Sequence, residues 1–106
     1  MFVQINTDNQ IETDADANEQ LEQRIRAKLK RFESRLSHVE LHVADVNGDK
    51  RGPDKRVSLE LRANGHVPIA VHAEASKVSV AVTAAADKAV RALDHALGKL
   101  KDSKGH

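Results

Sequence analysis

Apolar residues recur along this chain with two different periods, and these periods predict the order of its secondary-structure elements. Between residues 15 and 36 the apolar positions lie three or four residues apart, which is typical of one face of an amphipathic helix. That face comprises Leu21, Ile25, Leu29, Phe32 and Leu36. A second helical stretch begins near Ser76, a candidate N-cap, and its apolar face comprises Val82, Ala86, Ala89, Leu93, Ala96, Leu97 and Leu100.

Other stretches alternate apolar and polar residues, which is the period of a strand with one buried face. They cover residues 1–6, 38–46, 56–62 and 67–75. Pro68 has no backbone N–H to donate, so we expect it at the start of the last strand or at an edge of the sheet. Because each strand has a single apolar face, only one side of the sheet should be buried.

The resulting order, β-α-β-β-β-α, predicts an α+β fold. We expect a two-layer sandwich, in which a four-stranded mixed sheet carries both helices on one face. Short loops join the last three strands into an antiparallel meander, whereas the helical crossover allows the first strand to pair in parallel. The pattern predicts a single domain over residues 1–101 and a flexible tail over residues 102–106.

Composition excludes several classes of chemistry. The 106 residues include no Cys, which rules out disulfides, thiolate metal ligands and a Cys nucleophile. Phe2 and Phe32 are the only aromatic residues apart from histidine, so stacking of bases on an aromatic platform is not expected. The sequence shows neither a signal peptide nor an apolar run long enough to cross a bilayer, and we expect a cytoplasmic protein with no membrane partner.

Charge is segregated along the chain, although the formal net charge is only +1. Residues 1–23 carry six acids and no Lys or Arg, whereas residues 24–35 carry six bases and one acid. On the first helix Arg24, Lys28, Arg31 and Arg35 form one stripe, and on the second Lys77, Lys88, Arg91, His95 and Lys99 form another. Two such helices side by side would present a surface that binds polyanions, although ordinary solvated helix faces give the same pattern.

The remaining polar residues give little indication of catalysis or metal binding. Residues 45–49 resemble the start of a calcium-binding loop, but Lys50 replaces the required glycine and Arg56 replaces the final glutamate. The histidines are isolated, and pairing with Lys88, Arg91 or solvent accounts for Asp87 and Asp94. We therefore expect no metal site, no cofactor, no small-molecule substrate and no enzyme activity.

Several short segments, taken together in their order and spacing, resemble the ribosome hibernation promoting factor family. Its members are also called ribosome-associated inhibitor A or sigma-54 modulation proteins, and the resemblance spans roughly residues 1–101. It rests on residues 52–56, 59–62, 68–71 and 95–100, and on the segment from Ala73-Glu74 through Asp87-Lys88 to Arg91 and Leu93. The resemblance implies a fold similar to double-stranded-RNA-binding domains.

The resemblance also implies a function in translation. It implies that the protein binds the small ribosomal subunit during stress or stationary phase, in the groove where messenger and transfer RNA pass, and so inhibits initiation. The family's contacts to 16S ribosomal RNA come largely from basic helix residues, and the matching positions here are Lys28, Arg31, Lys88 and Arg91. Arg24, Arg35 and Lys99 extend this candidate RNA-binding set on the charge pattern alone.

The sequence departs from the family pattern in two places. Many members open the second helix with an Asp-x-Tyr element, but these positions here read Lys77-Val78-Ser79. Long members carry a C-terminal dimerisation module, and we expect none here, since the sequence ends at His106. The alternative hypothesis is a protein-interaction or stress-regulatory module that keeps the fold without binding the ribosome and works through acidic residues 8–22.

Overall fold

The computed structural model describes residues 1–7, 15–45 and 55–98, and their elements follow the expected order. The candidate residue Lys99, the loop expected at 47–54 and the tail expected at 102–106 lie outside this description. The elements are β1 (Phe2–Thr7), α1 (Ala15–Lys28), the 3-10 helix η1 (Lys30–Arg35), β2 (Leu36–Asp45), β3 (Lys55–Ala63), β4 (Ile69–Ala75), α2 (Val78–Leu93) and the π-helical turn η2 (Asp94–Gly98).

The strands form one sheet in the order β1-β2-β3-β4. β1 pairs in parallel with β2, and the other neighbours pair antiparallel. Leu59 lies opposite Leu41 on one side and Val71 on the other, so the apolar positions of adjacent strands share one face. The mixed sheet expected from the sequence is confirmed, and Pro68 immediately precedes β4, an edge strand, as expected.

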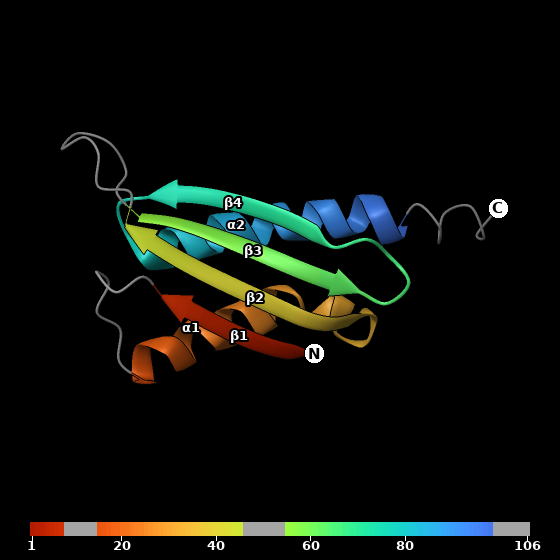
Figure 1. Ribbon diagram of the computed structural model, residues 1–106, viewed down its shortest axis with the longest axis horizontal. Helices are drawn as coiled ribbons and strands as arrows, with labels where there is room; N and C mark the ends of the chain where they lie inside the picture. Colours follow the sequence, from red (N-terminus) through yellow and green to blue (C-terminus); the bar gives the residue numbers. More distant parts are fainter. Residues whose placement is uncertain (8–14, 46–54, 99–106) are drawn as a thin grey trace.

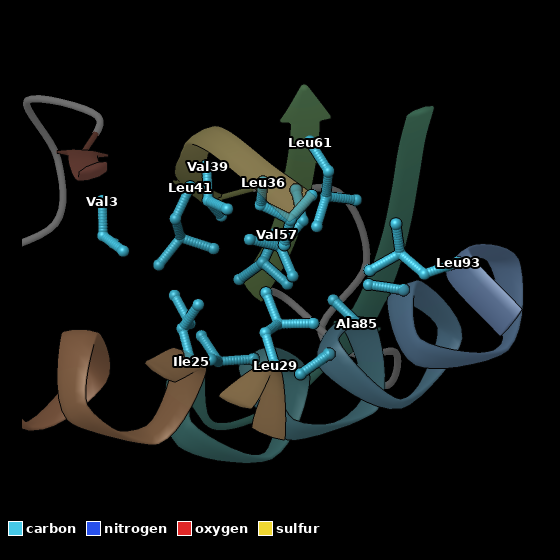
Figure 2. Close-up of a cluster of buried hydrophobic side chains, with 14 of the residues drawn as sticks. Val3, Ile25, Leu29, Leu36, Val39, Leu41, Val57, Leu61, Ala85 and Leu93 are labelled. Atoms are coloured by element: carbon cyan, nitrogen blue, oxygen red, sulfur yellow. The ribbon is translucent and has the colours of Figure 1, made fainter. Parts of the chain in front are cut away.

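Both helices cover the same face of the sheet (Figure 1). In this view α1 lies behind β1 and β2, and α2 lies behind β3 and β4. The two-layer α+β sandwich is therefore confirmed. Figure 2 shows side chains from both helices meeting those of the strands between the layers. Ile25, Leu29, Leu41, Leu59, Leu61 and Leu93 are fully buried there.

The core is aliphatic apart from Phe32, and alanines let α2 approach the sheet closely. Ala81, Ala85, Ala86 and Ala89 are all fully buried on the face of α2 that meets the core. A methyl side chain adds little thickness between the layers and favours the helix at no cost in side-chain entropy. The sequence pattern identified Ala86 and Ala89 on this face but missed Ala81 and Ala85.

Substitution of Ala85 with leucine is expected to destabilise the protein by about 1–3 kcal/mol, because the added isopropyl group has no space between α2 and the sheet. Ala85 has no exposed surface, and Figure 2 places its side chain between α2 and the strands. Urea denaturation followed by circular dichroism measures the change. Ala92→Leu, at a partly exposed position of the same helix, is the control and should shift the unfolding midpoint far less.

The first helix ends earlier than the sequence suggested. The apolar spacing predicted helix as far as residue 36, but α1 ends at Lys28 and Leu36 is the first residue of β2. Between them η1 tightens the backbone, and the Phe32 N–H donates to the Leu29 carbonyl at 2.9 Å. Phe32 and Leu36 are buried all the same, so the apolar pattern correctly identified core residues but not the type of helix.

The start of the second helix also differs from the prediction. Ser76 is not the N-cap, because the extended residue before the helix is Lys77 and no side chain caps it. Lys77 has an extended backbone, with φ −122° and ψ 140°, and the helix begins at the next residue, Val78. α2 ends at Leu93, and η2 continues the chain and buries Leu97.

Candidate nucleic-acid interface

The basic stripe of α1 lies along the seam between the two helices. Arg24 Nη1 donates to the Thr83 hydroxyl at 3.3 Å, and Lys28 Nζ donates to Asp87 Oδ1 at 2.9 Å. In the turn beyond α1, Arg31 Nη2 donates to Asp94 Oδ1. These contacts place the cations of α1 and η1 beside α2 and the start of η2.

The ion-pair partners of Asp87 in α2 and Asp94 at the start of η2 differ from those expected. The sequence suggested that Asp87 and Asp94 pair with Lys88, Arg91 or solvent, but their ion pairs reach Lys28 and Arg31 across the seam. A signal for this arrangement was present, since acids seven residues apart lie on the same flank of a helix. Sequence alone did not show that this flank would face the basic stripe of α1.

The α2 cations occupy two different sides of their helix. Lys88 Nζ donates to the backbone carbonyl of His72 at 2.8 Å, so this side chain turns toward β4 and away from α1. Arg91 lies one turn beyond Asp87, is exposed, and makes no ion pair within the described part of the chain. Arg91 therefore lies on the same flank of α2 as Asp87, which contacts Lys28, whereas Lys88 does not join the α1 stripe.

Two residues of the candidate RNA-binding set, Arg31 and Arg35, lie in η1, directly after α1. Arg31 lies over the Phe32 ring, with the guanidinium carbon 4.7 Å from the ring centroid. Arg35 is exposed in η1, and its backbone carbonyl accepts a hydrogen bond from the Asn64 N–H at 3.0 Å. The hydrogen bond ties this end of the stripe to the turn between β3 and β4.

We call Arg24, Lys28, Arg31 and Arg91 the seam cations.

Each helix also has one cationic side chain that contacts the backbone at an edge of the sheet. Arg26 Nη1 donates to the Met1 carbonyl at 3.1 Å, beside β1, and Lys88 contacts β4 in the same way. Unpaired backbone groups at a sheet edge can pair with another chain, and lysine or arginine side chains at an edge disfavour such pairing. Lys88 keeps further N–H donors beyond the one that contacts His72.

The face of the sheet opposite the helices is polar, as the sequence predicted, but its charges are mixed. Asn6 Nδ2 donates to Glu40 Oε2 at 2.6 Å, and Arg62 and Arg56 pair with Glu60 and Glu74. Phe2 is 60% exposed on this face, with its ring 5.3 Å from that of His38. Phe32 is buried, so among the described residues the helical face exposes no phenylalanine, tyrosine or tryptophan ring.

No group of three metal-ligating side chains comes together within residues 1–7, 15–45 and 55–98. In the same residues, no helix is long and apolar enough to cross a membrane.

The fold and the basic helices can be compared with known proteins. The model of the Sigma 54 modulation protein / S30EA ribosomal protein family matches residues 3–101. The chain belongs to this family. The resemblance drawn from short segments of the sequence is therefore confirmed, and the S30EA family is one of ribosome-associated proteins rather than of enzymes. No curated protein sequence matches the chain significantly.

Two solved structures have the same fold as this S30EA family member. The N-terminal domain of Protein Y from Thermus thermophilus has 16% sequence identity and a TM-score of 0.69, with 90% of this chain and 98% of that chain covered. A ribosomal subunit interface protein from Coxiella burnetii has 18% identity and a TM-score of 0.70, with 96% and 99% covered. At these identities the comparison establishes the fold, whereas the roles of individual residues rest on this chain's own geometry.

Proposed function

We propose that this S30EA family member is a ribosome-binding inhibitor of translation that docks its basic helices on the 16S RNA of the small ribosomal subunit. The observation that carries the proposal is the position of the seam cations. They come from α1, η1 and α2 and lie on one side of the molecule. Family membership supports a ribosomal partner. The protein acts by occupancy in the cytoplasm during stress or stationary phase, without turnover.

Each candidate residue has a defined part in this proposal. Arg24, Arg31 and Arg91 offer planar guanidinium groups that can contact two phosphate oxygens at once, and Lys28 offers a single point charge. Arg35 and Lys99 extend the surface, and Lys88 can reach a phosphate with the donors that His72 leaves available. Occupancy of the groove where messenger and transfer RNA pass would block initiation.

Recognition in this proposal depends on shape rather than on base identity. Sequence-specific recognition of RNA commonly uses aromatic side chains on which bases stack. Phe2 lies on the sheet face and Phe32 in the core, so neither is placed to stack a base against the helical face. Phosphate contacts from cationic side chains would then provide most of the affinity.

Binding to isolated small subunits is expected to weaken steeply as salt concentration rises. If the seam cations each neutralise one phosphate, the logarithm of the binding constant falls with the logarithm of salt concentration with a slope of about −3 to −4. Affinity should therefore drop about fifty-fold between roughly 0.1 and 0.3 M KCl. Co-sedimentation with purified subunits over a KCl series measures the slope, and a slope near zero would argue against phosphate contacts.

A sucrose-gradient profile of a stationary-phase lysate tests the proposed function in the cell. We expect the protein to migrate with small subunits or with ribosomes that contain them, and to leave these fractions when the gradient contains high salt. Migration at the top of the gradient, together with a pull-down that recovers a discrete protein and no ribosomal RNA, would support the interaction-module hypothesis instead.

A further inference from the structure

The α1–α2 seam is not uniformly positive, because Asp87 of α2 and Asp94, the first residue of η2, contribute two carboxylates to it. Asp87 Oδ1 lies 2.9 Å from Lys28 Nζ, and Asp94 pairs with Arg31. These four side chains keep between 40% and 64% of their surface exposed to solvent. A polyanion that approaches the α1 cations therefore meets carboxylates in the same surface.

These two acids are not needed to hold the helices together. Ion pairs between exposed side chains contribute little to stability, because water screens them and ordering the side chains costs entropy. The helices instead share the aliphatic core, in which Ile25, Leu29 and Ala85 are fully buried. The main physical effect of Asp87 and Asp94 is on the field that an incoming phosphate experiences, where each carboxylate cancels one positive charge.

We propose that Asp87 and Asp94 are specificity determinants, which lower the affinity of the seam for unstructured polyanions. The inference rests on the proposed function, since it concerns the same surface. On a protein surface without an aromatic platform, a flexible single strand binds mainly through its charge. Local carboxylates therefore weaken its binding directly. Folded RNA holds its phosphates at fixed positions, and such a surface can contact Arg24 and Arg91 while it keeps its phosphates away from the carboxylates.

The variant Asp87→Asn/Asp94→Asn tests this inference. The probe is fluorescein-labelled oligo(U) of about 20 nucleotides, which is longer than a typical single-strand site. Fluorescence anisotropy at about 0.1 M KCl should show that the variant binds the probe about tenfold more tightly than the wild type. Unchanged or weaker binding would overturn the inference, since weaker binding would mean that the acids position the cations rather than oppose the polyanion.

A matched control comes from the opposite face of the molecule. Glu60 and Glu74 also pair with arginines, at 3.2 Å from Arg62 and 3.8 Å from Arg56. The variant Glu60→Gln/Glu74→Gln raises the net charge by the same amount, and it should change the oligo(U) affinity less than about twofold. An equal gain in oligo(U) affinity in both variants would mean that net charge alone causes the effect, and it would overturn the inference. Thermal unfolding verifies that all three proteins are folded.

The outcome can be separated from that of the proposed function. Wild-type protein is first tested for co-sedimentation with isolated small subunits, which decides the proposed function alone. If the wild type pellets with subunits but the asparagine variant gains no affinity for oligo(U), the specificity role is wrong and ribosome binding stands. If the wild type does not pellet, the proposed function is wrong, and the specificity role for ribosomal RNA fails with it.

Discussion

Replacement of Arg31 and Arg91 with glutamine is expected to weaken binding to isolated small ribosomal subunits about a hundredfold at about 0.1 M KCl. Each lost charge-assisted contact to a phosphate accounts for roughly 1.5 kcal/mol, or about tenfold. Arg31→Gln also leaves Asp94 without its cation, which adds repulsion toward phosphate. Co-sedimentation measures the affinity, and the slope of its salt dependence should become shallower by about 2.

The control removes the same number of arginines from the opposite face. Arg56 and Arg62 pair with Glu74 and Glu60 on the outer face of the sheet. The variant Arg56→Gln/Arg62→Gln has the same net charge as the helix-face variant, and we expect it to bind subunits within about threefold of the wild type. An equal loss in both variants would show that net charge governs binding, and a loss confined to the control would place the interface on the sheet.

Truncation of Leu59 to alanine should lower the free energy of unfolding by about 2–5 kcal/mol. Leu59 is fully buried on β3, one of the two central strands, between Leu41 of β2 and Val71 of β4, so truncation of its side chain leaves a cavity beneath the helices. A loss of this size is a large fraction of the stability of a typical domain, about 5–15 kcal/mol. Urea denaturation followed by circular dichroism measures it.

Val67→Ala is the matched control for this truncation. Val67 is 80% exposed, so its methyl groups gain little from folding, and we expect a change within about 0.5 kcal/mol. Similar losses in the two variants would mean that β3 does not lie at the centre of the core.

The fold could be predicted from the sequence because apolar residues recur with one period in the strands and with another in the helices. Alternation over residues 38–46 and 56–62 located β2 and β3 to within a residue or two of their observed ends. The end of α1 could not be predicted in this way. Phe32 and Leu36 fit a helical stripe and also fit a 3-10 turn that leads into a strand, and the requirement that the chain turn back onto the sheet decides between them.

The candidate surface could be predicted only in part, for a different physical reason. Periodicity assigns Arg24, Lys28 and Arg31 to one stripe, but it does not give the rotation of α1 relative to α2. That rotation places Asp87 against Lys28 and turns Lys88 toward β4. Charge along the sequence therefore indicated a positive surface, whereas packing of the helices determines which cations share it and which carboxylates interrupt it.

Directed crosslinking to RNA tests the central claim, docking through the helical face, most directly. The chain has no Cys, so a single cysteine can carry a photo-crosslinker at a chosen position. Ala27 is exposed on α1 beside Lys28, and Ala70 is exposed on β4 at the sheet face. With bound small subunits, Ala27→Cys should crosslink to 16S RNA and Ala70→Cys should not. Crosslinks from Ala70→Cys alone, or from neither position in a protein that still pellets with subunits, would contradict docking through the helices.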